Sequence, residues 1–454
     1  MVIASLFFYS HWNVKYLPVI LISIGANFLM GQRLANSESA ANGRKFLLAV
    51  SITANIFALA YFKYTNFFIN NANLIFSTGF DLKSITLPLA ISFFTFTQIV
   101  YLVDSYKGET SHYNILNYAL FVTFFPHLIA GPIVQHSHIM PQFASPRRWR
   151  PSSDHILQGL FIFGIGLFKK AGIADTLAPA VAAGFDHGRF LNFYEAWVTS
   201  LAYTFQLYFD FSGYCDMAIG ASLMFNIVLP INFNSPYKAL NIQEFWRRWH
   251  ITLSGFLRDF IYIPLGGSRM SKRRTYINLL ITFALGGLWH GATWMFVLWG
   301  VLHGLALVVH RVWTSAGLKL PKALAWLVTF LFINISWVLF RAEDWSAASK
   351  ILWGMIDIQS AYGISSRAAP VSDLAWGGSM ADQLAGWIPA HLVGQLPLLP
   401  LLIVAFFLIC QKNSMELVRS SANIRYVLYG SLLFSFGLYF TLVQSSTVFL
   451  YFNF

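Results

Sequence analysis

Apolar stretches of nearly bilayer length recur from one end of the chain to the other. A helix needs roughly 20 mostly apolar residues to cross a bilayer, and glycine and proline interrupt several of these stretches, so we expect about ten to twelve spans. Hydrophobic residues make up 57% of the 454 residues and charged residues only 11%, which excludes an ordinary soluble domain. We therefore predict an all-α, polytopic membrane protein that forms one domain over residues 1–454.

The basic residues are distributed as in a membrane protein. A net charge of +12 would suggest nucleic-acid binding in a soluble chain. Here the charge lies in short clusters between apolar stretches, such as Arg147, Arg148 and Arg150 or the residues 269–274. Cytoplasmic loops of membrane proteins carry such clusters. We expect both clusters on the cytoplasmic side, membrane lipids as neighbours and no nucleic-acid partner.

The cysteines and the N-terminal stretch exclude two further features. Cys215 and Cys410 lie far apart in separate apolar stretches, which argues against a disulfide framework or a cysteine metal site. The N-terminal stretch lacks a basic region before it and continues past any plausible cleavage site. We therefore expect a retained membrane helix and not a signal peptide.

Phe121–Ile133 is apolar but unsuited to a straight helix. It contains Pro126, Gly131 and Pro132. Such a backbone is tolerated in a membrane only where it is buried in protein or lines a cavity. We predict a broken or re-entrant helix that lines an internal funnel.

Two histidines, His136 and His138, follow this segment. They could ligate a metal, but no third ligand stands at a spacing typical of zinc sites. We expect a polar loop that leads to the first basic cluster, and no metal site.

Two carboxylates separate the predicted spans Trp197–Phe209 and Met217–Leu229. Asp210 and Asp216 either form a polar junction between these helices or orient a histidine or arginine in the cavity, because intramembrane carboxylates usually pair with another group. Further upstream, Lys169 and Lys170 end the apolar stretch Ile156–Phe168 and are expected to anchor that helix at the membrane surface.

Asn241–Arg258 combines arginines, tryptophans and a histidine within a short distance. We predict one amphipathic helix next to the membrane, in which Glu244 and Arg248 pair at i,i+4. Arg247 and Arg248 could hold a phosphorylated donor, such as a coenzyme A thioester, at the cytoplasmic mouth.

His290 lies forty residues beyond His250, in an apolar stretch flanked by glycine. A histidine in hydrocarbon surroundings is costly and usually faces a polar cavity or pathway, so it marks a functional site. A neutral imidazole can take a proton from a hydroxyl that attacks an acyl carbonyl, and burial keeps it neutral. We therefore predict catalysis at His290. Trp294 is expected to pack against it. His303 and His310 are expected to be polar packing residues or interface anchors.

Arg341–Pro397 is the longest segment without a clear span. Its glycines, serines and scattered tryptophans predict a loop with amphipathic pieces that lie on the bilayer.

The signatures of several other enzyme classes are missing. The chain has no Gly-x-Ser-x-Gly, no His-Glu-x-x-His and no Gly-x-x-x-x-Gly-Lys-Ser/Thr sequence, which argues against a serine enzyme or an ATP-driven pump. It also has no internal repeat of the kind that transporters with inverted halves show. A membrane enzyme, a transporter and a structural membrane subunit remain open on these residues alone.

Six segments together resemble the membrane-bound O-acyltransferase (MBOAT) family, in particular its bacterial alginate O-acetyltransferase-like branch. They occur in the family's order and cover nearly the whole chain. The segments are Ile91-Ser92-Phe93-Phe94-Thr95-Phe96, Ile129-Ala130-Gly131-Pro132-Ile133-Val134, Asp210-Phe211-Ser212-Gly213-Tyr214, Phe245 to Ser254, Tyr262-Ile263-Pro264-Leu265-Gly266-Gly267 and Leu288-Trp289-His290-Gly291.

The resemblance implies a fold of many helices around a funnel, and a further hydrophobic segment before Met1. It also implies acyl transfer from a cytoplasmic thioester, acetyl-coenzyme A, as a co-substrate and without a cofactor, across the bacterial inner membrane. The expected partner is a periplasmic or membrane-anchored SGNH-type acetyltransferase, a separate hydrolase-like protein. The polysaccharide acceptor is then alginate, cellulose, peptidoglycan or another exopolymer.

The resemblance also assigns roles to individual residues. His290 matches the family's catalytic histidine, and His250 its second characteristic polar residue. The remaining expected contacts to substrate or donor are Trp246, Arg247, Arg248, Trp249, Trp289 and Asp210. A transporter of an acyl donor or acylated intermediate, and a scaffold subunit of a polysaccharide synthase, are the alternative hypotheses.

Overall fold

The computed structural model describes residues 1–36, 41–110, 113–186, 190–361, 398–419, 424–443 and 449–450. Within these ranges the chain is helical and contains no strand, which confirms the all-α prediction. The chain divides into two compact units. The described residues of the first unit lie in Met1–Phe163 and Tyr214–Ile231, and those of the second in Gly164–Gly213 and Asn232–Leu450.

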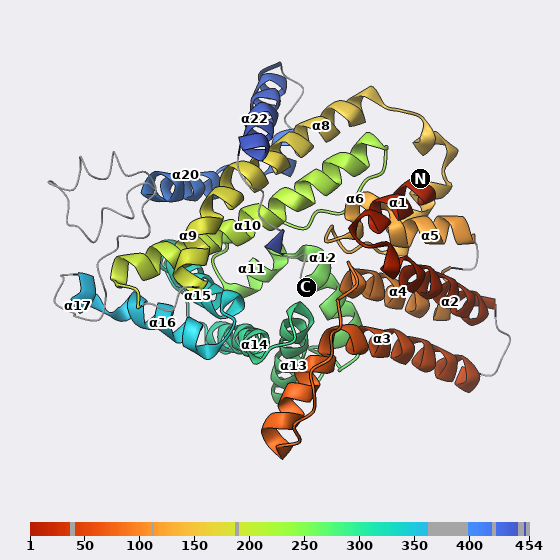
Figure 1. Ribbon diagram of the computed structural model, residues 1–454, viewed down its shortest axis with the longest axis horizontal. Coiled ribbons are helices and arrows are strands. Elements are labelled where there is room, and N and C mark those ends of the chain that lie inside the picture. The colour runs from red at the N-terminus through yellow and green to blue at the C-terminus, as the bar shows by residue number, and fades with distance from the viewer. Residues whose placement is uncertain are drawn as a thin grey trace. The chain divides into compact units, whose positions relative to one another are not determined.

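The first unit contains the N-terminal helices (Figure 1). In chain order they are α1 (Val2–Trp12), η1 (Val14–Tyr16), α2 (Leu17–Asn36), α3 (Ala41–Phe76), α4 (Ile91–Tyr106), α5 (Ile115–Thr123), α6 (Phe125–Leu128), α7 (His136–Ala144), η2 (Pro146–Trp149) and most of α8 (Ser153–Leu167). A long helix, α10 (Phe193–Met224), is shared between the two units.

The second unit contains the helices of the later chain. They are η3 (Phe168–Ala174), α9 (Asp175–Asp186), η4 (Pro236–Lys238), α11 (Ile242–Arg248), α12 (Ile251–Leu257), η5 (Arg258–Tyr262), α13 (Lys272–His290), α14 (Trp294–Ser315), α15 (Lys322–Arg341), α16 (Trp345–Ile356), α17 (Ile358–Ala361), α20 (Leu398–Cys410), α21 (Ser414–Arg419) and α22 (Ile424–Val443).

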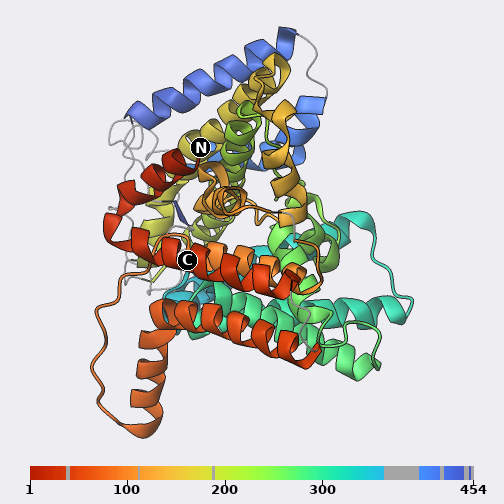
Figure 2. The same cartoon turned by 90° about the vertical axis from the view of Figure 1, so that its right-hand side faces the viewer.

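Side-chain amides and small residues join the helices of the first unit. Asn27 on α2 and Asn55 on α3 exchange amide hydrogen bonds of 3.1 and 2.6 Å, which satisfies two polar groups buried between apolar helices. Gly31 allows α2 to approach α4, since a Cβ there would lie 2.2 Å from the ring of Tyr101. Figure 2 shows α2, α3 and α4 packed beside one another.

In the second unit, glycines allow the helices α13 and α14 to pack closely. A Cβ on Gly287 of α13 would lie 2.1 Å from the Phe296 carbonyl oxygen on α14. In the same way, a Cβ on Gly300 of α14 would lie 2.2 Å from the Phe283 carbonyl oxygen. The two backbones can therefore pack directly on each other, which holds the C-terminal end of α13 against α14.

Several helices of the described chain have the length and hydropathy of membrane spans. Five meet both criteria: Val14–Asn36, Asn42–Phe76, Ser153–Asp186, Trp294–Ser315 and Lys322–Arg341. Two shorter apolar helices, Leu398–Cys410 and Leu428–Val443, add to them. The chain is thus a multi-pass membrane protein, while the number of ten to twelve spans stays a prediction.

The structure both confirms and corrects the predicted elements. The break in Phe121–Ile133 is confirmed, because α5 ends at Thr123 and α6 is a separate short helix. The polar junction between two spans at Asp210 and Asp216 is wrong, since both residues lie inside the continuous helix α10. Its backbone hydrogen bonds run through the polar stretch without interruption.

The long segment after Arg341 is helical where the structure describes it. It begins with α16 and α17, and α16 buries Ala348, Ile351 and Met355 on one face. The rest of the predicted loop, residues 362–397, lies outside the described residues. Within the described part of the chain, no disulfide joins Cys215, which is buried, to Cys410, which is exposed.

Candidate active site

The predicted amphipathic helix over Asn241–Arg258 is interrupted at its centre. Asn241 caps α11 by accepting the backbone N–H of Glu244 at 2.8 Å. The helix ends at Arg248, and His250 adopts a left-handed conformation with φ 43° and ψ 54° before α12 begins. A left-handed residue other than glycine carries strain, so the surrounding contacts must hold it. Prediction of one continuous helix here was therefore wrong.

Backbone hydrogen bonds to an upstream loop hold this break in place. The N–H of Ile251 donates to the carbonyl oxygen of Asn232 at 3.0 Å. The N–H of Asn234 donates to the carbonyl oxygen of Arg248 at 2.9 Å. These bonds satisfy backbone groups that a helix would otherwise pair, and they bring the 232–234 loop against His250.

The side chain of Asn232 fixes the ring of His250. Its Oδ1 accepts the Thr252 backbone N–H at 3.2 Å and the Thr252 hydroxyl at 3.0 Å. A backbone N–H can only donate, so this atom is the amide oxygen. It also lies 3.1 Å from Nδ1 of His250, which must then carry the proton. Nε2 of this fully buried imidazole is consequently its basic nitrogen.

His290 is the last residue of α13 and is brought next to His250. It is 2% exposed, and the ring centroids of the two histidines lie 6.4 Å apart. Gly291 follows in an extended conformation, where a Cβ would lie 2.1 Å from the ring of Phe296. Only glycine therefore lets the chain leave α13 so close to α14.

Aromatic rings surround His290. Trp289, Trp299 and Phe340 have ring centroids 5.0, 5.3 and 5.1 Å from the His290 ring. The predicted contact of Trp294 with this ring stays a prediction; α13 ends at His290, so the two residues do not share a helix, and Trp294 is 63% exposed. The result is a buried pair of imidazoles within an aromatic shell.

His303 lies in the aromatic layer next to this pair and is fully buried. The indole N–H of Trp246 donates to its Nδ1 at 3.1 Å. Its Nε2 must then carry the proton, and it lies 3.1 Å from the hydroxyl oxygen of Ser336. Both ring nitrogens of His303 thus have polar neighbours, as expected of a polar packing residue.

The predicted tryptophan and arginine contacts occupy different environments. Trp246 and Trp249 are buried, and Trp249 stacks on Phe245 with ring centroids 5.6 Å apart. Arg248 pairs with Glu244 at 2.9 Å, as predicted, and donates to the Asn234 carbonyl oxygen at 3.1 Å. The side chain of Arg247 is exposed. A role for these residues in donor binding stays a prediction.

Among the described residues, Asp210 pairs with a lysine and not with a histidine or an arginine. Its carboxylate lies 2.8 Å from the ammonium group of Lys170, and its other oxygen accepts the Leu450 backbone N–H at 2.9 Å. Lys170 also pairs with Asp175 at 2.5 Å, and its side chain is only 15% exposed. The surface anchor predicted at Lys170 is therefore wrong.

Close helix packing explains this ion pair. A Cβ on Gly213 would lie 2.7 Å from the Gly166 carbonyl oxygen, so α10 packs directly on the chain that leads into η3. This approach brings Lys170 to Asp210, and a buried carboxylate needs a counter-ion. The sequence predicted a histidine or an arginine as the partner of Asp210, because the spacing of Lys170 gives no sign that it lies next to Asp210 in the fold.

Sequence reasoning missed three residues of the site: Asn232, Trp299 and Phe340. Trp299 and His303 stand four residues apart on α14, a spacing that places them on one face and could have indicated their common role. Asn232 lies in a loop and gave no periodic signal. Only the fold brings it to His250.

Comparison with known proteins places these histidines in a described family. Residues 43–342 match the sequence model of MBOAT, the membrane-bound O-acyltransferase family. The peptidoglycan O-acetyltransferase of Helicobacter pylori is 47% identical over an alignment that covers 100% of this chain and 91% of that protein. The matched range contains both His250 and His290.

Less similar relatives carry other names. "Probable alginate O-acetylase AlgI" of Pseudomonas aeruginosa is 41% identical, with 80% of this chain and 69% of that protein covered. The teichoic acid D-alanyltransferase of Streptococcus thermophilus is 29% identical, with 56% of this chain and 68% of that protein covered.

Proposed function

Because the chain belongs to the membrane-bound O-acyltransferase family, and is therefore an acyltransferase, we propose that it passes an acetyl group across the bacterial inner membrane. Acetyl-coenzyme A in the cytoplasm is the proposed donor and co-substrate. The acetyl group serves the O-acetylation of an extracytoplasmic polysaccharide. Its first acceptor is a hydroxyl of a periplasmic or membrane-anchored SGNH-type acetyltransferase.

The observation that carries this proposal is the buried pair of His250 and His290. A base that removes a hydroxyl proton must be neutral and shielded from bulk water. His290 is the proposed base, because it ends α13 within the aromatic shell. His250 is the proposed relay, because Asn232 leaves its Nε2 as the basic nitrogen.

The proposed reaction balances with these groups alone. The acceptor oxygen forms a bond to the thioester carbonyl carbon while its proton moves to the imidazole of His290. The bond between carbon and sulfur then breaks, and the proton passes to the leaving thiolate. Free coenzyme A and an acetyl ester result, and the imidazole returns to its neutral form.

Peptidoglycan is the proposed final acceptor. The relative that is named for peptidoglycan aligns with the whole of this chain at 47% identity. The relative that is named for alginate aligns with 80% of it at 41%. Alginate is the second candidate on that observation, and the choice of polymer rests with the partner acetyltransferase.

Thiol release from acetyl-coenzyme A tests the reaction. The detergent-purified chain is assayed with and without the extracytoplasmic domain of its partner, as wild type and as His290→Ala. General-base loss lowers rates by about 10²–10⁴-fold, and we expect this loss for His290→Ala. His310→Ala removes an imidazole that is only partly buried on α14, so it should release thiol at the wild-type rate.

The same assay separates acyl transfer from the alternatives. A transporter or a scaffold subunit would release no thiol under any condition. Wild-type turnover by a folded His290→Ala protein would remove His290 from the mechanism. Release that requires His290 but not the partner would contradict the partner as acceptor.

A further inference from the structure

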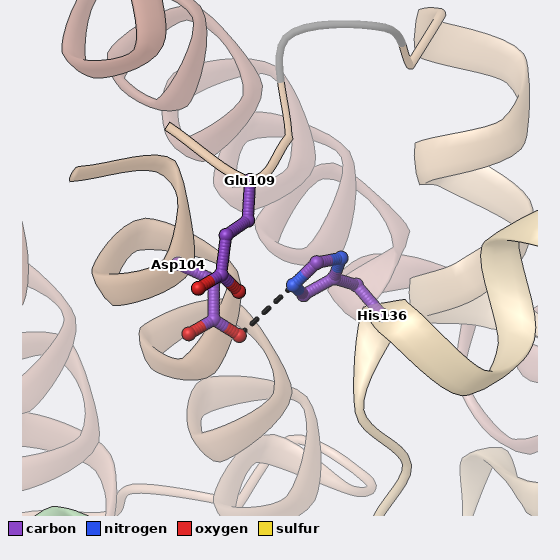
Figure 3. A group of neighbouring side chains, drawn as sticks. All are labelled: Asp104, Glu109 and His136. Atoms are coloured by element: carbon purple, nitrogen blue, oxygen red, sulfur yellow. Dashed lines mark ion pairs between the residues drawn. The ribbon is translucent and has the colours of Figure 1, made fainter. Parts of the chain in front are cut away.

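The first unit contains a second group of chemically reactive side chains. Asp104 lies near the C-terminal end of α4, Glu109 in the turn after it, and His136 at the first position of α7. One ligand atom from each lies within 4.8 Å of the others (Figure 3). We propose that these three side chains bind one divalent transition-metal ion of the zinc class.

Two of the three ligands are buried and already converge. Nε2 of His136 lies 2.9 Å from Oδ2 of Asp104. His136 is 1% exposed and Asp104 8% exposed. Figure 3 shows the imidazole directed at the carboxylate of Asp104, with the carboxylate of Glu109 beside it. Glu109 is exposed, so an ion can enter from its side.

The imidazole of His136 is buried, and its polar surroundings are the proposed co-ligands. Nε2 lies 2.9 Å from the Asp104 carboxylate, and the Glu109 carboxylate is within 4.8 Å. Among the described residues, Nδ1 has no hydrogen-bond partner. Buried polar side-chain atoms are nearly always satisfied, so an imidazole with this single polar contact requires an explanation. A metal ion bound by Nε2 and the two carboxylates would give these groups a shared partner.

Lys107 occupies the other oxygen of Asp104. Its ammonium nitrogen lies 2.8 Å from Oδ1, which leaves Oδ2 directed at His136. Groups outside the ligand shell orient metal-binding carboxylates in this way. The side chain of Lys107 is 51% exposed, so its charge is partly screened by solvent. Two carboxylates against one ammonium leave a net negative charge for a cation.

The ligand types select the ion. Imidazole with two carboxylates suits zinc and similar transition metals, whereas calcium takes six to eight oxygens and magnesium favours oxygen and water. Ligand atoms around one tetrahedral zinc lie about 3.3 Å apart, given bonds of about 2.0–2.1 Å. The three ligand atoms lie within 4.8 Å of one another, so binding of zinc would require them to approach by at most about 1.5 Å.

The site would join the turn after α4 to the start of α7. Three protein ligands leave a fourth position for water. Asp104 precedes His136 by thirty-two residues, which explains why histidine spacing alone predicted no metal here. The proposal is independent of the acyl transfer proposed for His250 and His290.

Zinc binding by the full chain tests the proposal. The detergent-purified protein, prepared without a histidine tag, is dialysed against zinc chloride and its metal content is measured by mass spectrometry. We expect one tightly bound zinc ion per chain. Loss of a supporting residue weakens metal sites by about 10–100-fold, so His136→Ala and Glu109→Gln should weaken binding by at least that factor.

A matched control lies two residues away. His138 is an exposed histidine on the same helix, so His138→Ala removes an imidazole but leaves the proposed ligands. It should bind zinc as the wild type does, and zinc should raise the thermal unfolding temperature of both. Glu109→Gln decides the outcome if His136→Ala does not fold, because residue 109 lies in an exposed turn.

Three results would overturn the proposal. The wild type could bind no zinc at micromolar concentrations. His138→Ala could weaken binding as much as His136→Ala. Calcium or magnesium could bind in preference to zinc, which would exclude the assigned class of ion.

Discussion

At the scale of single residues, Asn232 determines the chemistry available to His250. One amide oxygen receives the N–H and hydroxyl of Thr252 and faces Nδ1 of His250. The ring is thereby held in one tautomer and one orientation, with Nε2 as the basic nitrogen. Asn232 acts through His250 and is a positioning residue.

Asn232→Ala should lower the turnover number for thiol release by about 10–100-fold, the usual effect of removing an orienting partner. Asn232→Asp should retain more activity, because a carboxylate oxygen also accepts from Nδ1. The control is Thr252→Val, which removes a hydroxyl from the same oxygen and leaves His250 in place. Equal losses in Asn232→Ala and Thr252→Val would indicate a loop defect and not a change at His250.

At the scale of helices, the direct contact of α13 and α14 places His290. At Gly287 and Gly300 the two helix backbones leave no room for a side chain. A change here alters where α13 ends, and with it the distance between the two imidazoles. The same principle operates at Gly213, where α10 approaches the chain that carries Lys170.

Gly287→Ala should destabilise the protein by about 1–3 kcal/mol, because its methyl group would overlap the Phe296 carbonyl. The rate of thiol release should also fall, because the end of α13 carries His290. Gly255→Ala is the matched control, since a Cβ at Gly255 in α12 meets nothing within 4 Å. It should stabilise the protein by about 0.4–1 kcal/mol. Thermal unfolding of both variants measures the difference, and similar unfolding temperatures would contradict the packing argument.

The ion pair between Asp210 and Lys170 gives a second prediction at this scale. Removal of one partner from a buried pair costs about 3–5 kcal/mol, so Asp210→Asn should destabilise the fold by an amount near the lower end, because Lys170 keeps Asp175. Adding Lys170→Met should recover part of that loss. Denaturant unfolding of the single and double variants checks this, and additive losses would argue against the pair.

At the scale of the whole molecule, the chain is a multi-pass membrane acyltransferase. Its relatives carry the names of three different acceptors or acyl groups, namely peptidoglycan, alginate and teichoic acid D-alanine. Related membrane acyltransferases can supply acyl groups to different polymers if a separate partner acetyltransferase selects the polymer. The proposed peptidoglycan role is therefore tested in cells.

A bacterial strain that lacks its own peptidoglycan O-acetyltransferase should regain ester-linked acetate on peptidoglycan when this chain and its partner are expressed. Mild base releases the acetate, and chromatography measures it. His290→Ala should give none, and His310→Ala should give the wild-type amount. Acetate on alginate but not on peptidoglycan, in a strain that makes both, would favour the second acceptor.

The sequence by itself determined the all-α membrane fold, the broken helix at residues 121–133, and the pair of Glu244 and Arg248. These features depend on local hydropathy, on proline and glycine, or on helical spacing. Only the tertiary structure decided that His250 interrupts a helix and faces Asn232, that Lys170 neutralises Asp210, and that Asp104 and Glu109 meet His136. Such contacts join residues far apart in the chain, and they form because buried polar groups must find partners wherever helix packing brings them.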